Sequence, residues 1–136
     1  MRYLAIDHGN KRTGLAICDA DETIASPLAV LRERGTLAEK IAEIIQTENV
    51  DAIVLGLPLN MDGSEGGQAK LVRKFAETLM ARADVPLHFQ DERLSSFGAE
   101  EKLREAGMTR KKKAARVDAI AAAEILTAFL DSKRAQ

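Results

Sequence analysis

One short run limits the fold more than any other part of the chain. Residues 51–57 are DAIVLGL, and every position after Asp51 is apolar. A strand with one face in water alternates apolar and polar side chains, whereas a strand buried on both faces is apolar throughout. Such strands are typical of parallel sheets that carry helices on both faces. The run therefore predicts an α/β fold with parallel pairing around residues 51–57.

The first thirty residues have a different pattern. The stretch LAIDHGNKRTGLAIC, residues 4–18, contains two apolar runs on either side of a short turn. We expect strands at 3–7, 14–19 and 24–31, joined by tight turns into an antiparallel meander. Later strands alternate with helical periodicity, so right-handed crossovers should place them parallel to the first strand.

These patterns predict one domain, residues 1–136, with a mixed five-stranded sheet of three antiparallel and then two parallel strands, flanked by helices. The helix after residue 63 is expected to bury a stripe of Leu71, Phe75 and Leu79. The last helix should follow a basic loop. The remaining strands are expected at 51–57 and 86–90, the helices at 37–48, 64–82, 95–107 and 116–130, and the basic loop at 108–115.

Composition limits the partners and the compartment. The net charge of −1 gives no general attraction to nucleic acid, so local basic patches would have to bind phosphate. No run approaches the roughly 18 apolar residues of a membrane span, and no signal-peptide stretch precedes Asp7. The single Cys18 excludes an intramolecular disulfide and fits a reducing compartment. We expect a cytoplasmic protein without a membrane partner.

Acidic side chains lie where two of the expected parallel strands end. Asp7 ends the first strand, and Glu92 follows the strand at 86–90. Ligands of open α/β sheets bind outside the carboxyl ends of such strands, so we expect both acids, with Asn60 beside them, at one edge. Asp118 lies on the apolar face of the last helix, where an unpaired carboxylate is costly to bury.

Three carboxylates without a Cys or His cluster favour Mg²⁺ or Mn²⁺. Paired ions of this kind can activate water and stabilise a leaving oxygen in phosphodiester cleavage. Each acid also has a simpler interpretation, and these alternatives stay open. Asp7 could be a turn residue, Glu92 could form an exposed ion pair with Arg93, and Asp118 could interact only with the N-terminal dipole of its helix.

Basic and polar residues near these acids are candidates for phosphate contacts. Two cations lie in the first turn, and a basic cluster precedes Asp118. Ser64 could cap the helix that follows, whose free N–H groups would form an anion site. The basic cluster could instead be an ordinary solvated loop. The candidate nucleic-acid-binding residues are Lys11, Arg12, Asn60, Ser64, Arg93, Arg110, Lys111, Lys112, Lys113 and Arg116.

Four motifs in order resemble the RuvX family, also called YqgF. They are AIDHGNKRTGLAICD, IVLGLPLNMDGSEGGQA, FQDERLSS and RVDAIAAAEIL, and the resemblance spans residues 2–131. It implies an RNase H-like fold and a nuclease in which Asp7, Glu92 and Asp118 are the metal-binding catalytic acids, with Mg²⁺ or Mn²⁺ as cofactor. His8 stands where many relatives would carry an apolar or aromatic residue. We interpret it as a surface variation, with a neutral polar neighbour of the metal site as the alternative.

The resemblance also implies the substrate. We expect a hydrolase that acts on structured RNA, in 5′ processing of pre-16S rRNA and so in ribosome biogenesis, with the small ribosomal subunit as a possible partner. Branched DNA is the rival substrate, and a resolvase would need a homodimer rather than a monomer to make paired cuts. A non-catalytic module for nucleic-acid binding or ribosome assembly is a further alternative. A sugar kinase or actin-like ATPase also begins with a hairpin of the pattern apolar-Asp-x-Gly. Such a protein encloses its nucleotide between two related domains, and 136 residues supply only one.

Overall fold

The computed structural model describes residues 1–93 and 110–135, so the helix expected at 95–107 lies outside the described residues. The five expected strands are present, each within two residues of its predicted bounds. The elements are β1 Tyr3–His8, β2 Thr13–Cys18, β3 Ala25–Leu31, α1 Leu37–Thr47, β4 Ala52–Leu57, α2 Gly67–Met80, β5 Leu87–Asp91 and α4 Arg110–Arg134.

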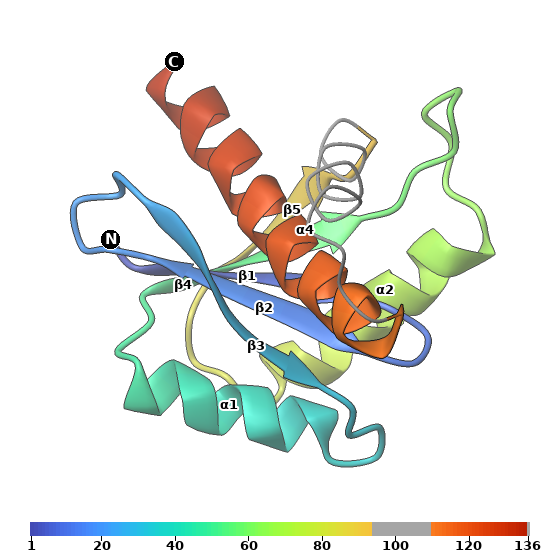
Figure 1. The fold of residues 1–136 in the computed structure, drawn as a ribbon, viewed down its shortest axis with the longest axis horizontal. Helices are drawn as coiled ribbons and strands as arrows, with labels where there is room; N and C mark the ends of the chain where they lie inside the picture. The colour runs from blue at the N-terminus through green and yellow to red at the C-terminus, as the bar shows by residue number, and fades with distance from the viewer. Residues whose placement is uncertain (94–109, 136) are drawn as a thin grey trace.

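The strands form one sheet in the order β3-β2-β1-β4-β5 (Figure 1). β1 pairs antiparallel with β2, and β2 pairs antiparallel with β3. β4 runs parallel to both β1 and β5. Every residue of β4 is buried, as its apolar run requires. The predicted mixed sheet is therefore confirmed, with β4 inserted between the first and fifth strands.

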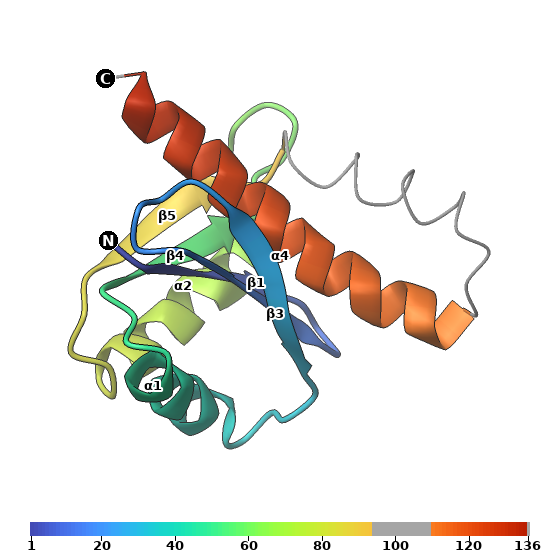
Figure 2. The same ribbon diagram turned by 60° about the vertical axis from the view of Figure 1, so that its left-hand side comes forward.

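Helices cover the two faces of this sheet unequally (Figure 2). α1 and α2 lie on one face, where they pack on the large side chains of alternate strand residues such as Leu4 and Ile6. α4 is the helix that crosses the other face within the described residues, and it packs on the intervening residues, among them Tyr3 and Ala5. Successive strand residues point to opposite faces, so Asp7 belongs to the α4 face and His8 to the α1/α2 face.

α1 matches its predicted bounds, whereas α2 differs from its prediction. α2 begins at Gly67, three residues after the expected start, with Gly66 at the N-cap. The expected stripe is right in part, because Leu79 is fully buried and Phe75 packs against the core, whereas Leu71 is 55% exposed. The buried positions are Ala69, Val72, Ala76 and Leu79, which repeat at offsets of three and four. Each step of four residues advances by about 40° around the helix, so Leu71 lies about 80° from Leu79 and falls outside the buried face.

α4 begins at Arg110, so the predicted basic loop is wrong. Residues 110–116 are Arg, Lys and Ala, which are strong helix formers although they carry no apolar periodicity. Asp118 therefore lies two turns inside the helix, and it is not a first-turn partner of the helix dipole. The apolar face predicted for this helix is confirmed by the burial of Ala122 and Ile125. None of the described helices is long and apolar enough to cross a membrane.

Candidate active site

Asp7 and Glu92 meet although the strand β4 separates them in the sheet. Asp7 lies near the end of β1, and Glu92 directly follows β5, where its N–H donates a hydrogen bond to Leu57 O at 3.1 Å. Their side chains form a hydrogen bond to each other. The carboxyl ends of the parallel strands thus bring two acids from opposite halves of the chain into contact.

A glycine in β4 makes room for this contact. A Cβ atom on Gly56 would lie 2.7 Å from Glu92 Oε1 and 2.7 Å from Ile125 Cδ1. Any side chain at this position would occupy the space through which Glu92 reaches across β4 toward Asp7. We did not predict a role for Gly56. The signal was present, since a glycine within an otherwise apolar strand often marks a close approach.

Burial and like charge keep a proton on this pair. Burial raises the pKa of Asp7, and the charge of Asp118 raises it further, while the hydrogen bond from Glu92 lowers it. Burial also raises the pKa of Glu92 to about 9, with added contributions from the Asp7 hydrogen bond and from the charges of Asp7 and Asp91. Near neutral pH, Glu92 therefore carries the proton, and its O–H donates a hydrogen bond to the Asp7 carboxylate.

Asp118 approaches from α4 and is paired with a cation. Arg12 Nε donates a hydrogen bond to Asp118 Oδ2 at 2.6 Å, with the two side chains 29% and 22% exposed. α4 comes this close because Gly14 in β2 has no side chain, and a Cβ there would overlap the backbone carbonyl of Asp118. Gly14 is the register partner of Asp7, so this contact brings α4 over the end of β1.

The structure does not gather all three acids into one compact cluster. Asp7 and Glu92 are hydrogen-bonded to each other, whereas Asp118 is paired with Arg12. Within residues 1–93 and 118–135, no three Asp, Glu, His or Cys side chains are close enough to hold a metal ion. The donor set nevertheless suits a hard divalent cation, since it consists of carboxylate oxygens whose mutual repulsion calls for positive charge.

The basic candidate residues differ in their exposure and in their hydrogen-bond partners. Lys11 is exposed in the β1–β2 turn. Arg93 lies next to Glu92, but its guanidinium donates to Asp91 at 2.7 Å and to the Met61 carbonyl at 3.3 Å. Arg110, Lys111, Lys112, Lys113 and Arg116 belong to the first turns of α4, where the side chains lie outside the described part of the chain.

The loop after β4 has its own hydrogen bonds, and Ser64 does not cap α2. Asp62 Oδ1 accepts hydrogen bonds from the Ser64 N–H at 2.9 Å and from its hydroxyl at 2.6 Å. The Asn60 amide donates to Ser64 Oγ at 3.0 Å. The aspartate turn satisfies Ser64 locally, so the helix begins only at Gly67. Asn60 itself is exposed near the carboxyl end of β4.

Two further residues beside the acids have roles that we did not predict. Our interpretation of His8 as a surface variation is wrong, because its ring stacks on Phe75 of α2 at 4.2 Å and an interplanar angle of 5°. Burial and the charge of Arg34 lower the pKa of His8. Arg34 also donates to the Gly9 carbonyl at 2.9 Å, which adds a cation beside the β1–β2 turn. No sequence spacing links Arg34 to residue 9.

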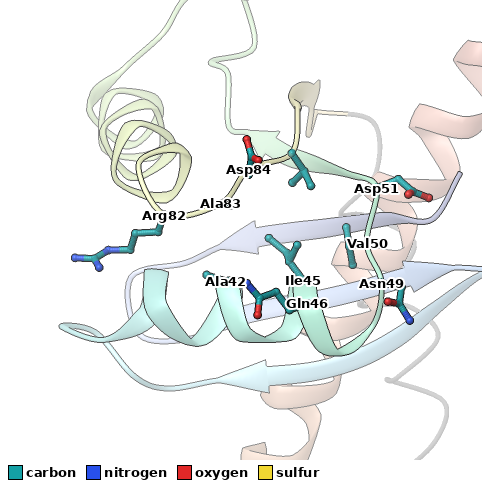
Figure 3. Close-up of a pocket in the computed structure, with 10 residues that line it drawn as sticks. Ala42, Ile45, Gln46, Asn49, Val50, Asp51, Arg82, Ala83 and Asp84 are labelled. Carbon is teal, nitrogen blue, oxygen red and sulfur yellow. The ribbon is translucent and has the colours of Figure 1, made fainter.

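A pocket of about 400 Å³ lies at the opposite end of the sheet (Figure 3). Residues from the end of α1 and from the segments that precede β4 and β5 line it, including Gln46, Asp51 and Asp84. The acids follow the carboxyl ends of the strands, whereas this pocket lies beside their amino ends. We therefore do not assign it to the active site.

Comparisons of the sequence identify close relatives. A family model described as "RuvX: Holliday junction resolvase" matches residues 1–132. A protein of Anaeromyxobacter sp. (strain Fw109-5) named "Putative pre-16S rRNA nuclease" is 47% identical over 137 residues, which cover 99% of this chain and 100% of that protein. A protein of Maridesulfovibrio salexigens with the same name is 44% identical over 132 residues, with 96% and 98% covered.

Solved structures with little sequence identity have the same fold. T. thermophilus RuvC in complex with Holliday junction substrate matches with a TM-score of 0.63 at 17% identity, covering 100% of this chain and 97% of that one. The fowlpox virus Holliday junction resolvase matches with a TM-score of 0.59 at 13% identity, covering 98% and 99%. The fold is therefore a RuvC-like RNase H fold, and by its sequence this chain belongs to the RuvX (YqgF) family.

Proposed function

We propose that this chain is a metal-dependent endonuclease that hydrolyses phosphodiester bonds of pre-16S rRNA at the 5′ end, in the cytoplasm. The observation that carries the proposal is the buried, hydrogen-bonded pair Asp7–Glu92, which joins two acids from the carboxyl ends of β1 and β5. The names of the relatives support the RNA substrate.

Asp7, Glu92 and Asp118 would hold Mg²⁺ or Mn²⁺, which when bound supplies an activated water and charge stabilisation at the leaving oxygen. Glu92 has to lose its proton before the pair can offer two carboxylates to a cation. Arg12 holds Asp118 at the rim of the site, and its guanidinium has further N–H donors for a phosphate. Lys11, exposed in the same turn, adds positive charge on the substrate side.

The decisive experiment compares two matched Asp→Asn variants. A precursor RNA with a 5′ extension is incubated with wild type, Asp7→Asn or Asp84→Asn in Mg²⁺ or Mn²⁺. Asp84 is exposed before β5, at the other end of the sheet. We expect Asp7→Asn to lower cleavage by more than about a hundredfold, since even outer-shell partners of a metal cost 10–100-fold, and Asp84→Asn to cleave normally. Equal cleavage by all three proteins would refute the role of Asp7, and no cleavage by any of them would favour a non-catalytic binding module.

A second candidate is the cleavage of branched DNA. It is favoured by the description of the family model and by the fold shared with RuvC and the fowlpox virus resolvase. A four-way DNA junction tested beside the precursor RNA under the same conditions separates the two substrates. Paired symmetric cuts in the junction, made by a dimer and absent in Asp7→Asn, would support the second candidate over the first.

A further inference from the structure

Aromatic rings gather on the same sheet face as the acids, but toward the amino ends of the strands. The rings of Tyr3 and Phe129 meet edge to face with centroids 5.1 Å apart. His88 lies 5.4 Å from Phe129 and 6.4 Å from Tyr3. Tyr3 is 3% exposed, whereas Phe129 is half-buried and His88 is exposed, so the cluster opens to the surface rather than closing into core.

This cluster forms the wall of a pocket of about 450 Å³ between β5 and the last turns of α4. The pocket has apolar ring faces on its inner side and polar groups at its rim, where an amide, a hydroxyl and an ammonium group can form hydrogen bonds. The lining includes Tyr3, His88, Gln90, Phe129, Ser132 and Lys133. Its size and flat walls suit a planar aromatic ring.

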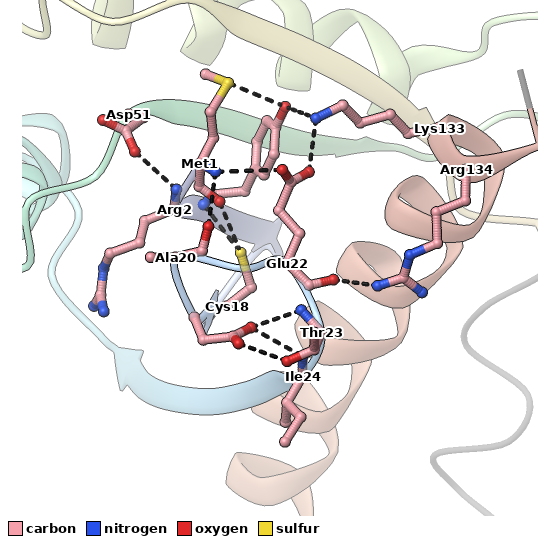
Figure 4. Close-up of polar contacts among 12 residues, drawn as sticks. Met1, Arg2, Cys18, Ala20, Glu22, Thr23, Ile24, Asp51, Lys133 and Arg134 are labelled. Carbon is pink, nitrogen blue, oxygen red and sulfur yellow. Dashed lines mark hydrogen bonds and ion pairs between the residues drawn. The ribbon is translucent and has the colours of Figure 1, made fainter.

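The cation at the rim is held in place by two hydrogen bonds. Lys133 Nζ donates to Tyr3 OH at 2.9 Å and to Glu22 Oε1 at 2.6 Å, and it lies 5.0 Å from the centroid of the Tyr3 ring (Figure 4). Within the described residues these bonds use two of the three N–H donors of the ammonium group. One donor is left for an anionic group at the mouth of the pocket, so the ligand that fits is a flat ring linked to an anion.

The pocket and the acids lie along the same two elements. His88, Gln90 and Glu92 alternate onto the α4 face of β5, and four residues of strand place His88 about 13 Å from Glu92. On α4, Phe129 and Asp118 are eleven residues apart, which is three turns and about 16 Å along one stripe. At the 3.4 Å rise of a stacked strand this corresponds to about four or five nucleotides, and to fewer when the strand is extended.

We infer that this pocket binds one unpaired nucleobase of the substrate strand, a few nucleotides from the bond that the acids cleave. The base would stack on Phe129 and His88, its edge would meet Gln90 and Ser132, and the neighbouring phosphate would meet Lys133. The inference rests on the proposed function, since it is the acids that make nucleic acid the ligand of this face. It assigns the enzyme a preference for a single-stranded segment beside the cleavage site, because bases in a duplex are not available for stacking on protein rings.

Binding of a short single-stranded RNA tests the pocket without cleavage. Fluorescence anisotropy in EDTA gives the Kd for a labelled RNA of about eight nucleotides, and for versions with an abasic site at each position in turn. We expect one abasic position to weaken binding to wild type about tenfold, in keeping with stacking energies of roughly 1–3 kcal/mol per base. Phe129→Leu should weaken binding to the intact RNA to a similar extent and should be insensitive to that abasic site.

The helix α2 offers a control on the opposite face of the sheet. Leu71→Ala changes an exposed apolar side chain that does not line the pocket, and it should bind RNA like wild type. Lys133→Gln should reduce the slope of log Kd against log salt by about one, as loss of one phosphate contact does. If Phe129→Leu proves unstable, the exposed His88→Ala variant takes its place. The same oligonucleotide in DNA shows whether the pocket reads the base alone or the ribose as well.

The outcomes separate this inference from the proposed function. Equal abasic profiles for wild type, Phe129→Leu and His88→Ala, or the absence of any RNA binding in EDTA, would overturn the pocket even if cleavage depends on Asp7. Conversely, a base-dependent loss in Phe129→Leu together with unaltered cleavage by Asp7→Asn would support the pocket and refute the nuclease site.

Discussion

The two faces of the sheet are built from neighbouring residues of the same strands, yet their side chains differ in size. Toward α1 and α2 the strands present Leu4, Ile6, Leu15, Ile53 and Leu55, all fully buried. Toward α4 the intervening positions are Ala5, Ala16, Ala52 and Val54, with Gly14 and Gly56 beside the acids. α4 adds its own small residues, including Ala122 and Ala123.

The difference in side-chain size suits the two faces to different roles, stability on the α1/α2 face and the candidate site on the α4 face. Large apolar side chains on one face remove the most surface from water and account for most of the hydrophobic stabilisation. Small residues on the other face let α4 lie close to the sheet. They also leave room between α4 and the sheet for Asp7 and Glu92 to meet. A charged site needs such space, because large side chains would either exclude the carboxylates or separate them.

The largest expected effect tests the packing of the first face. Leu55 and Val54 are adjacent in β4, fully buried, and point to opposite faces. Leu55→Ala should lower the free energy of unfolding by about 2–5 kcal/mol. Val54→Ala removes two methylene equivalents and should cost about 1.6 kcal/mol. Denaturant titration measures both, and an equal loss would show that the two faces contribute alike.

Cation binding should stabilise the protein only through the α4 face. At a hundredfold excess of Mn²⁺ over its Kd, wild type should gain roughly 2.7 kcal/mol of stability. Asp7→Asn should gain much less, while Asp84→Asn should gain as much as wild type. Thermal unfolding with and without Mn²⁺ measures the gain. The same shift in Asp7→Asn would contradict a shared site at the acids.

Close packing of α4 predicts contrasting effects at two glycines. Gly14→Ala would place a methyl group against the backbone of Asp118, so α4 has to move, at a cost of about 1–3 kcal/mol. Cleavage should fall as well, since Asp118 moves with the helix. Gly35→Ala meets no atom within 4 Å and should change stability by less than about 0.5 kcal/mol. A neutral Gly14→Ala, measured by denaturant titration, would mean that α4 is not closely held.

A further expected effect is a dependence on pH in the metal-free protein, over the range between the usual pKa of a glutamate and the raised pKa of Glu92. The pKa of Glu92 is raised from 4.5 to about 9 in the folded state. The stability contributed by the proton is therefore fully present below pH 4.5 and is lost as pH rises toward 9. The slope approaches about 1.4 kcal/mol per pH unit for one proton.

The slope of the unfolding free energy against pH can be measured by denaturant titration. Wild type and Glu92→Gln are compared in EDTA at several pH values across this range. The amide cannot ionise, so the variant should be less sensitive to pH and more stable than wild type at the alkaline end. Leu55→Ala serves as the control, because it lowers stability on the other face without altering the slope. Parallel curves for wild type and Glu92→Gln would show that Glu92 does not hold the proton.

Much of this fold could be predicted because the pattern of apolar residues within each strand indicates which of its faces are buried. The run at 51–57 is apolar at every position, which specified a strand buried on both faces, and β4 is such a strand. The start of α4 could not be predicted from periodicity, since Arg110 to Lys113 form helix on propensity alone. The start of α2 depended on a turn at Asp62, which competes with helix for the N–H of Ser64.

The site could be predicted only in part. The rule for parallel strands indicated that Asp7 and Glu92 share an edge, and the structure brings them together. The pairing of Arg12 with Asp118 joins residues 106 positions apart, and no spacing in the sequence indicates it. Gly56 matters because the Glu92 side chain, which follows β5, passes over β4 to reach Asp7 on β1. This path becomes apparent only once the sheet order is known.

Glu92 reaches Asp7 only by crossing over Gly56, which has a consequence for the newly made protein. During synthesis the first hairpin can form early, but its acid has no carboxylate neighbour until the edge strand β5 has been added beside β4. Asp118 emerges later still, with the final helix. Under the proposed function, a ribosome that carries a partly completed chain would not be exposed to a complete set of acids, and cleavage of RNA would begin only when the last helix closes over the sheet.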